Sequence, residues 1–281
     1  MISRIKYPPP LPTSAAVDMQ QQKYTAPTHS PRRTFLYAIR FLISLLCMEV
    51  MLHLLYVVAI SKTRVFTSLT PFQLLMVGYF NLHIIWLKLL LPWRFFRLWS
   101  LTDAIDPPEN MLRCMSNNYS AVAFWRAWHR SFNRWTIRYI YIPLDGARHP
   151  IRNMVIVFTF VALWHDISMK LLTWGWLIVL FVAPELVAKK IFTAKRFEGR
   201  EGRYRFLCAL GGVGNMSLMF LANLVGFALG VDGVKALIKG IFGSMGGVVV
   251  IVMSAVSVFS AVMMMYEIRM GEKRKGIDLR C

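Results

Sequence analysis

The chain has 281 residues, of which 56% are hydrophobic and only 17% are charged, and its mean hydropathy is +0.48. This composition excludes an ordinary soluble domain and indicates a protein that crosses the membrane several times. The 33 lysines and arginines outnumber the 14 acidic residues and give a net charge of +19. Such an excess suggests nucleic-acid binding in a soluble chain, so its distribution must first be compared with membrane topology.

Residues 1–34 are proline-rich, polar and without apolar periodicity, which predicts a disordered tail. Six apolar stretches follow this tail. Each is about 20 residues long, which is the length needed to span a bilayer. They cover residues 35–60, 72–92, 152–169, 171–188, 207–230 and 241–266. Glycines 211, 212 and 214 weaken the fifth stretch. The predicted fold is all-α, a polytopic transmembrane helical bundle over residues 35–267, followed by a basic tail, 268–281.

The basic residues are divided unevenly between the two sides of the predicted membrane protein. If all six stretches span, the segments 1–34, 93–152, 189–206 and 268–281 lie on one side and hold 26 lysines and arginines, against five on the other. The positive-inside rule then places both termini in the cytoplasm. The net charge is therefore mainly a topology signal, and no nucleic-acid partner is expected.

The connection 93–152 contains an amphipathic segment, residues 117–143, that we expect to be a helix lying on or re-entering the cytoplasmic side of the membrane. Its apolar face is aromatic and its opposite face is basic, with arginine at every fourth position. An interfacial helix whose rings lie at headgroup level and whose arginines bind lipid phosphates would give the same pattern. The aromatic residues are Trp125, Trp128, Phe132, Trp135 and Tyr139, and the arginines are Arg126, Arg130, Arg134 and Arg138.

Two histidines interrupt this arrangement at positions that favour a function. His129, with Asn133 one turn later, lies at the border between the aromatic and basic faces. His165, with Asp166, interrupts the third apolar stretch about 20 Å from its basic end. Ionisable groups at that depth usually have a function. The structural alternatives are a histidine hydrogen-bonded between helices and a span that ends before Trp164.

The sequence contains no recognisable motif for other kinds of chemistry. The four cysteines have no metal-ligand spacing, and nucleotide-binding loops, GxSxG, HExxH and paired carboxylates are absent. We therefore expect no metal and no resident cofactor. Glu185 is expected to pair with Lys189, and Asn215 and Asn223 are expected to form hydrogen bonds between helices.

Several motifs resemble those of the membrane-bound O-acyltransferase family. They are FWRAWHRSFNRW from Phe124, RYIYIPL from Arg138 and LWHD ending at Asp166. The runs WLKLLLPWRFFRLW from Trp86 and IDPPENMLRCMSNNYSA from Ile105, with WHD in place of the usual WHG, resemble the glycerol-uptake-protein branch of this family.

This resemblance implies transfer of a fatty acyl group from acyl-coenzyme A, a co-substrate, to a hydroxyl of a lipid acceptor, in this branch a lyso-glycosylphosphatidylinositol in the endoplasmic reticulum. It implies that His165 is the catalytic base and His129 the second active-site group, supported by Asn133 and Asp166. The arginine face would bind coenzyme A phosphates, although lipid phosphates give the same pattern. Trp125, Trp128, Trp135 and Trp164 would line the acyl tunnel or the membrane interface.

The chain departs from the family pattern in two ways. Asp145 and Gly146 stand where the family usually has paired glycines, which affects the local turn. Family members also begin with further spans, so we expect either a fragment, an incorrect gene start or a shortened form of the enzyme. A non-catalytic membrane adaptor with the same fold and a glycerol transporter remain alternative functions.

Overall fold

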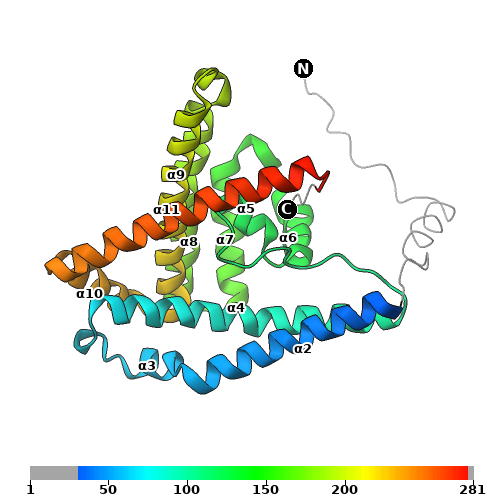
Figure 1. Cartoon of the computed structure of the whole chain (residues 1–281), viewed down its shortest axis with the longest axis horizontal. Coiled ribbons are helices and arrows are strands. Elements are labelled where there is room, and N and C mark those ends of the chain that lie inside the picture. Colours follow the sequence, from blue (N-terminus) through cyan, green and yellow to red (C-terminus); the bar gives the residue numbers. More distant parts are fainter. Residues whose placement is uncertain (1–30, 278–281) are drawn as a thin grey trace. The chain divides into compact units, whose positions relative to one another are not determined.

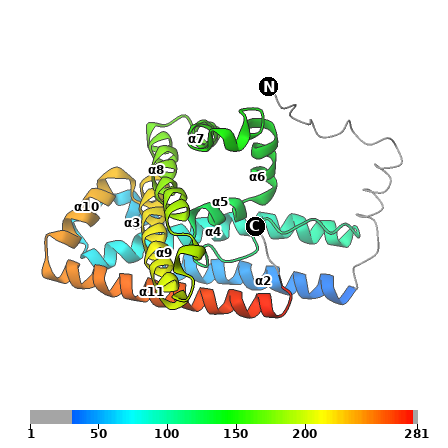
Figure 2. The same ribbon diagram turned by 90° about the horizontal axis from the view of Figure 1, so that it is seen from above.

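The computed structural model describes residues 31–277, and every regular element in that part of the chain is helical (Figure 1, Figure 2). Five helices are long and apolar enough to cross a membrane, which confirms the predicted all-α polytopic class. They are α2 (Pro31–Leu54), α4 (Pro71–Thr102), α8 (Met169–Ile191), α9 (Glu201–Asn223) with its π-helical extension η5 (Leu224–Ala228), and α11 (Met245–Arg274).

Shorter helices connect these five. They are α3 (Val57–Thr63), η1 (Phe66–Ser68), α5 (Ala121–Ala127), α6 (Arg130–Thr136), η2 (Ile137–Tyr141), η3 (Gly146–Arg148), α7 (Pro150–His165), η4 (Ala194–Phe197) and α10 (Gly230–Phe242). The predicted tails lie outside the described residues at positions 1–30 and 278–281.

The first two spans have different limits from those predicted. Helix α2 begins at Pro31, inside the predicted tail, because proline is well suited to the first helical position. It ends at Leu54 rather than 60, since the backbone leaves helical geometry at Tyr56. Helix α4 continues through Pro92 to Thr102, because transmembrane helices tolerate an internal proline when the apolar sequence continues on both sides.

The third predicted span, 152–169, is wrong in length. Helix α7 has 16 residues and ends at His165, after which Asp166 is extended. Ser168 then caps α8, its side chain accepting a hydrogen bond from the Leu171 amide. Sixteen residues measure about 24 Å, less than the hydrocarbon core of about 30 Å. The prediction that both termini are cytoplasmic requires a sixth crossing and stays a prediction.

The C-terminal spans are longer than predicted. Helix α9 runs without interruption through its glycines, and Gly212 lies where a methyl group would come within 3.1 Å of Val262 on α11. That glycine therefore permits close packing of α9 on α11, which crosses it in Figure 1. Helix α11 continues to Arg274, so part of the predicted tail 268–281 is helical.

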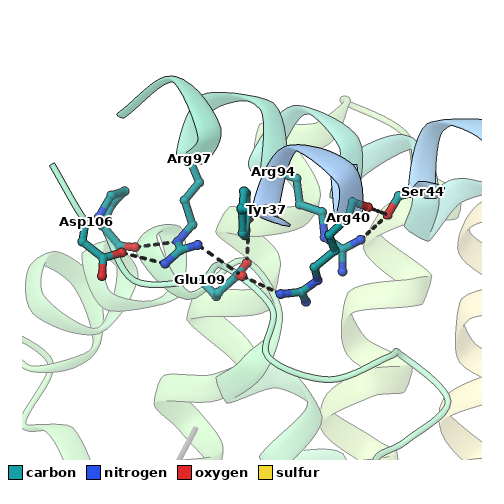
Figure 3. A network of polar contacts seen from close by, with 8 residues as sticks. Tyr37, Arg40, Ser44, Arg94, Arg97, Asp106 and Glu109 are labelled. Carbon is teal, nitrogen blue, oxygen red and sulfur yellow. Dashed lines mark hydrogen bonds and ion pairs between the residues drawn. The ribbon is translucent and has the colours of Figure 1, made fainter. Parts of the chain in front are cut away.

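The chain forms two compact units. Unit 1 comprises the residues up to Glu49 together with Lys88–Glu109, and unit 2 comprises Val50–Leu87 together with the residues from Asn110 onward. Unit 1 contains a polar network (Figure 3). Its Glu109 carboxylate accepts hydrogen bonds from Tyr37 at 3.2 Å and from Arg40 at 3.1 Å.

Unit 2 contains two apolar cores. One lies between α4, η5 and α10, where Leu74, Leu224 and Leu237 are buried. The other lies between α5, α7, α8 and α9, with Ala162 and Trp174 at its centre. The second core supports the residues that the sequence singles out.

Candidate functional site

The amphipathic segment 117–143 is not one continuous helix. It breaks between α5 and α6 at His129, whose backbone is left-handed with φ 46° and ψ 60°. Asn110 stabilises the break, because its carbonyl accepts from the Arg130 amide at 3.1 Å and its side chain accepts from the Ser131 amide at 3.0 Å. The predicted single helix with one uninterrupted arginine face is therefore wrong.

A buried carboxylate holds the start of α5. Ser120 is the N-cap of this helix, and its side chain accepts from the Ala123 amide at 3.1 Å. Glu185 of α8, only 6% exposed, accepts from the Ser120 hydroxyl and, at 3.2 Å, from the Val122 amide. Its predicted pairing with Lys189 is confirmed. Glu185 thus fixes the first turn of α5 to α8, a role that its sequence neighbours do not indicate.

His129 lies half-buried at the start of α6. Its ring stacks on Phe132, with centroids 5.5 Å apart. Burial lowers the pKa of His129 below its ordinary value, and the nearby His165 lowers this pKa further. Asn133, predicted to support the site, donates from its side-chain amide to the Arg126 carbonyl at 3.4 Å. It therefore links α6 to the end of α5.

His165 is the last residue of α7, and its side chain packs against aromatic rings while remaining partly exposed. Its ring centroid lies 6.1 Å from that of Trp174 and 5.8 Å from that of Phe227, both edge-to-face. Asp166 is exposed, and its carboxylate has no hydrogen-bonding or ionic partner among the described residues. Nor does any group of three histidine, cysteine or acidic residues within residues 31–277 form a metal site.

A stack of rings connects the two histidines. Phe132, which stacks on His129, also stacks on Trp164, with centroids 4.8 Å apart. Trp164 in turn lies 5.1 Å from the ring of its neighbour His165. The structure therefore places both predicted catalytic histidines at one aromatic cluster, with two rings between them along this path.

Trp174 packs against His165 and was not among the residues predicted from the sequence. It is 2% exposed, and its indole N–H donates to Asn223 at 3.2 Å. This bond between α8 and α9 confirms the interhelical role predicted for Asn223. A methyl group at Gly226 would come within 2.7 Å of the Trp174 ring, so only glycine fits beside it. The next residue, Phe227, has its ring 5.8 Å from that of His165.

The predicted tunnel or interface tryptophans lie in different surroundings. Trp125 is half-buried, 5.8 Å from Trp174 and 5.2 Å from Phe158, and its buried indole nitrogen has no acceptor among the described residues. Trp128 stacks on Phe124 at 5.4 Å. Trp135 is 45% exposed and stacks on Phe160. The aromatic face therefore packs largely on α7 and α8.

The four arginines lie on three elements. Arg126 is on α5, Arg130 and Arg134 are on α6, and Arg138 is on η2. All are exposed except Arg130, which is half-buried. The guanidinium of Arg138 lies 5.7 Å from the Tyr139 ring. Three positive charges are therefore accessible to an anionic group, and the predicted phosphate contacts stay a prediction.

The turn before α7 has a backbone conformation that favours glycine at positions 145 and 146. Asp145 and Gly146 both have positive φ, 65° and 49°, a conformation that glycine adopts without steric cost. Asn153, fully buried, donates to the carbonyls of Leu144 at 2.7 Å and Gly146 at 2.8 Å. This asparagine holds the turn against α7 and was not identified from the sequence.

Two further polar side chains, Asn215 and His83, have hydrogen-bonding partners in the structure. Asn215 donates to the Tyr119 carbonyl at 3.3 Å, so it joins α9 to the segment before α5. His83 has its two ring nitrogens 2.9 Å from the Tyr79 carbonyl and from the Ser116 hydroxyl. Both residues therefore have structural partners inside unit 2.

Comparison with known proteins identifies the family of this chain. Residues 10–231 match the model of MBOAT, the membrane-bound O-acyltransferase family. The chain is 54% identical over 261 residues to the membrane-bound O-acyltransferase GUP1 of Saccharomyces cerevisiae, covering 93% of this chain and 46% of that protein. It is 50% identical over 264 residues to gup1 of Schizosaccharomyces pombe, covering 94% and 45%.

A more distant relative shares part of the chain. The mouse protein-cysteine N-palmitoyltransferase HHAT is 28% identical over 189 residues, covering 63% of this chain and 38% of that protein. The chain spans about half the length of its yeast relatives. The family match extends over most of the sequence and includes both histidines. The chain therefore belongs to the membrane-bound O-acyltransferase family, in the branch of the GUP1 proteins.

Proposed function

We propose that this chain transfers a fatty acyl group from acyl-coenzyme A to a hydroxyl of a lipid acceptor. The observation that carries the proposal is the aromatic cluster that holds His129 and His165 together. Acyl transfer from a thioester needs a base near the acceptor hydroxyl and a group that stabilises negative charge on the carbonyl oxygen. Two imidazoles in one apolar setting can supply both.

His165 is the base in this proposal. Its ring packs on Trp174 and Phe227 but is otherwise exposed, so an acceptor hydroxyl can approach it. The imidazole takes the hydroxyl proton as the oxygen attacks the thioester carbonyl carbon. When the carbon–sulfur bond breaks, the imidazolium returns this proton to the departing thiolate. No covalent enzyme intermediate is required.

His129 is the charge-stabilising group. Its lowered pKa keeps the ring neutral near pH 7, and a neutral imidazole still donates one hydrogen bond. That N–H would face the developing charge on the thioester oxygen. Arg126, Arg134 and Arg138, all exposed, would attract the coenzyme A phosphates, since guanidinium groups bind phosphate in a bidentate manner.

The acceptor and the compartment are finer proposals. The resemblance to the glycerol-uptake-protein branch supports a lyso-glycosylphosphatidylinositol acceptor in the endoplasmic reticulum membrane. The concentration of arginine and lysine on one side of the predicted topology supports cytoplasmic termini. Acyl-coenzyme A, made in the cytosol, would then reach the arginines from that side.

The proposal is tested by measuring transfer of a labelled acyl group from acyl-coenzyme A to lipid in membranes that contain the chain. His165→Ala is expected to lower the rate by about 10²–10⁴, the usual contribution of a general base. His149→Ala is the matched control, because His149 is an exposed histidine at the other end of the same helix. It should keep the wild-type rate.

Full activity of His165→Ala would refute the proposed role of His165. Binding of a partner protein without any acyl transfer by the wild-type chain would favour a non-catalytic adaptor. Glycerol counterflow in liposomes that is independent of acyl-coenzyme A would favour a transporter. Absence of acyl transfer by the wild-type chain contradicts the enzyme proposal itself, whereas full activity of His165→Ala contradicts only the role of His165.

A further inference from the structure

We propose that Arg94 and Arg40 of unit 1 bind the phosphate group of a membrane lipid. The proposed site lies in the polar network between the first half of α2 and the second half of α4 (Figure 3). It shares no residue with the histidine cluster and does not depend on the proposed acyl transfer.

Arg94 has an edge that the protein leaves unused. Its Nη1 donates to the Ser44 hydroxyl, which itself donates to the Arg40 carbonyl at 2.8 Å. Its Nε is buried and has no acceptor among residues 31–277, and none is found there for Nη2 either. A buried charged donor without an acceptor is costly. Nη2 is the donor of Arg94 that is left for a phosphate oxygen.

The carboxylates of the network are occupied by other groups. Glu109 accepts from Tyr37, Arg40 and, at 3.5 Å, from Arg97. Asp106 lies 2.6 Å from another nitrogen of Arg97. Figure 3 shows Asp106 beside Arg97 and Glu109 between Arg97 and Arg40, with Arg94 directed toward Ser44.

The network therefore has an excess of positive charge beside Arg94. It contains three guanidinium groups, of Arg40, Arg94 and Arg97, and two carboxylates, so one positive charge has no counter-charge within it. Arg40 and Arg94 are close enough to repel each other, and an anion between them would relieve this repulsion. The Arg40 side chain is 48% exposed and Arg94 is half-buried, so both are partly accessible to a ligand.

The position of the pair on the two helices favours a lipid as the source of the phosphate. Arg40 is the tenth residue of α2 and Arg94 is the ninth from the end of α4, so each lies in the half of its helix nearer to the start of α2 and the end of α4, two helices of spanning length. These are the helix ends that the distribution of basic residues assigns to one membrane surface. Lipid phosphates lie at this level, and arginine beside them is favourable. A phosphomonoester, with a charge near −2, suits two guanidinium groups best.

The experiment uses the purified full chain in a neutral detergent. Thermal unfolding is followed while short-chain phosphatidic acid, phosphatidylcholine with the same acyl chains, or inorganic phosphate is added. Phosphatidic acid is expected to raise the unfolding temperature of the wild-type chain at lower concentrations than the other two. Arg94→Gln should raise the concentration needed by at least about tenfold, the value of one lost charged hydrogen bond.

Two further variants and one control sharpen the test. Arg94→Lys keeps the charge but not the planar edge, so it should bind with an affinity between those of the wild type and Arg94→Gln. Arg40→Gln changes a half-exposed side chain and should also weaken binding, even if Arg94→Gln fails to fold. Arg205→Gln is the control, because Arg205 also has a buried Nε without an acceptor but is paired with Glu267.

The proposal is overturned if phosphatidic acid protects the wild type, the Arg94 variants and Arg205→Gln equally, or protects none of them. It is also overturned if inorganic phosphate protects as strongly as phosphatidic acid, since the ligand would then be a free anion. Loss of protection in Arg94→Gln and Arg40→Gln, with Arg205→Gln unchanged, supports it.

Discussion

Glu185 and Arg94 are both charged side chains in helices of spanning length, and the protein treats them differently. The Glu185 carboxylate, 6% exposed, receives donors from Ser120, Val122 and Lys189. The Arg94 guanidinium has one acceptor, Ser44, and a buried Nε with none among the described residues. A charged group whose polar atoms all have partners within the protein stabilises the fold. A charged group with a buried polar atom that lacks a partner suggests a ligand.

The largest effect is expected from removing the carboxylate of Glu185. Glu185→Ala leaves the Ser120 hydroxyl and the start of α5 without their acceptor, so we expect unfolding to become easier by about 3 kcal/mol. Thermal or denaturant unfolding of the chain in detergent measures this. Glu185→Gln, which retains one acceptor, should lose less. Glu198→Gln, a change at an exposed glutamate, should be neutral.

A smaller effect is expected from removing the acceptor of Arg94. Ser44→Ala removes the one acceptor of Arg94 and should destabilise the chain by about 1–2 kcal/mol in detergent. If a lipid phosphate occupies the other edge of Arg94, saturating phosphatidic acid should recover part of this loss. The comparison between Glu185 and Arg94 fails if Ser44→Ala and Glu185→Ala respond alike to phosphatidic acid, because only the Arg94 site should depend on an added anion.

The smallest effect concerns His129, whose ring is neutral near pH 7 because its pKa is lowered. Because burial lowers its pKa in the folded chain, the unfolded chain binds the proton first as the pH falls. Stability should therefore decrease as the pH drops through the ordinary histidine value, about 6.5. His129→Gln should lose this part of the pH dependence, and His149→Gln should keep it. An unchanged pH profile in His129→Gln would place the titration elsewhere.

The sequence predicts local features of this molecule better than distant contacts. The apolar stretches identify the long helices, and the spacing of Glu185 and Lys189 correctly predicts their pair. Their ends are less accurate, because α4 continues through Pro92 and α7 stops at His165 without a glycine or proline to mark it. Local pattern does not encode which distant group satisfies a helix end.

The candidate site shows the same limit. Its two histidines come from the family resemblance and from their polar character in apolar surroundings. The break at His129 could not be predicted, because helical spacing continues across it and the residue that stabilises it, Asn110, lies 19 positions earlier. Likewise Trp174 and Phe227 meet His165 only through the packing of α7, α8 and η5.

The helices on either side of His129 are short, seven residues in α5 and twelve in α6 with its extension η2, and isolated helices shorter than about 12–15 residues are marginal. Residues outside these helices stabilise them: Glu185 accepts a hydrogen bond at the start of α5, and Asn110 accepts one at the start of α6. The orientation of the His129 ring therefore depends on Glu185 and Asn110, two residues distant in the sequence. Amide deuterium uptake across both helices should accelerate together when either residue is replaced, long before the surrounding long helices exchange.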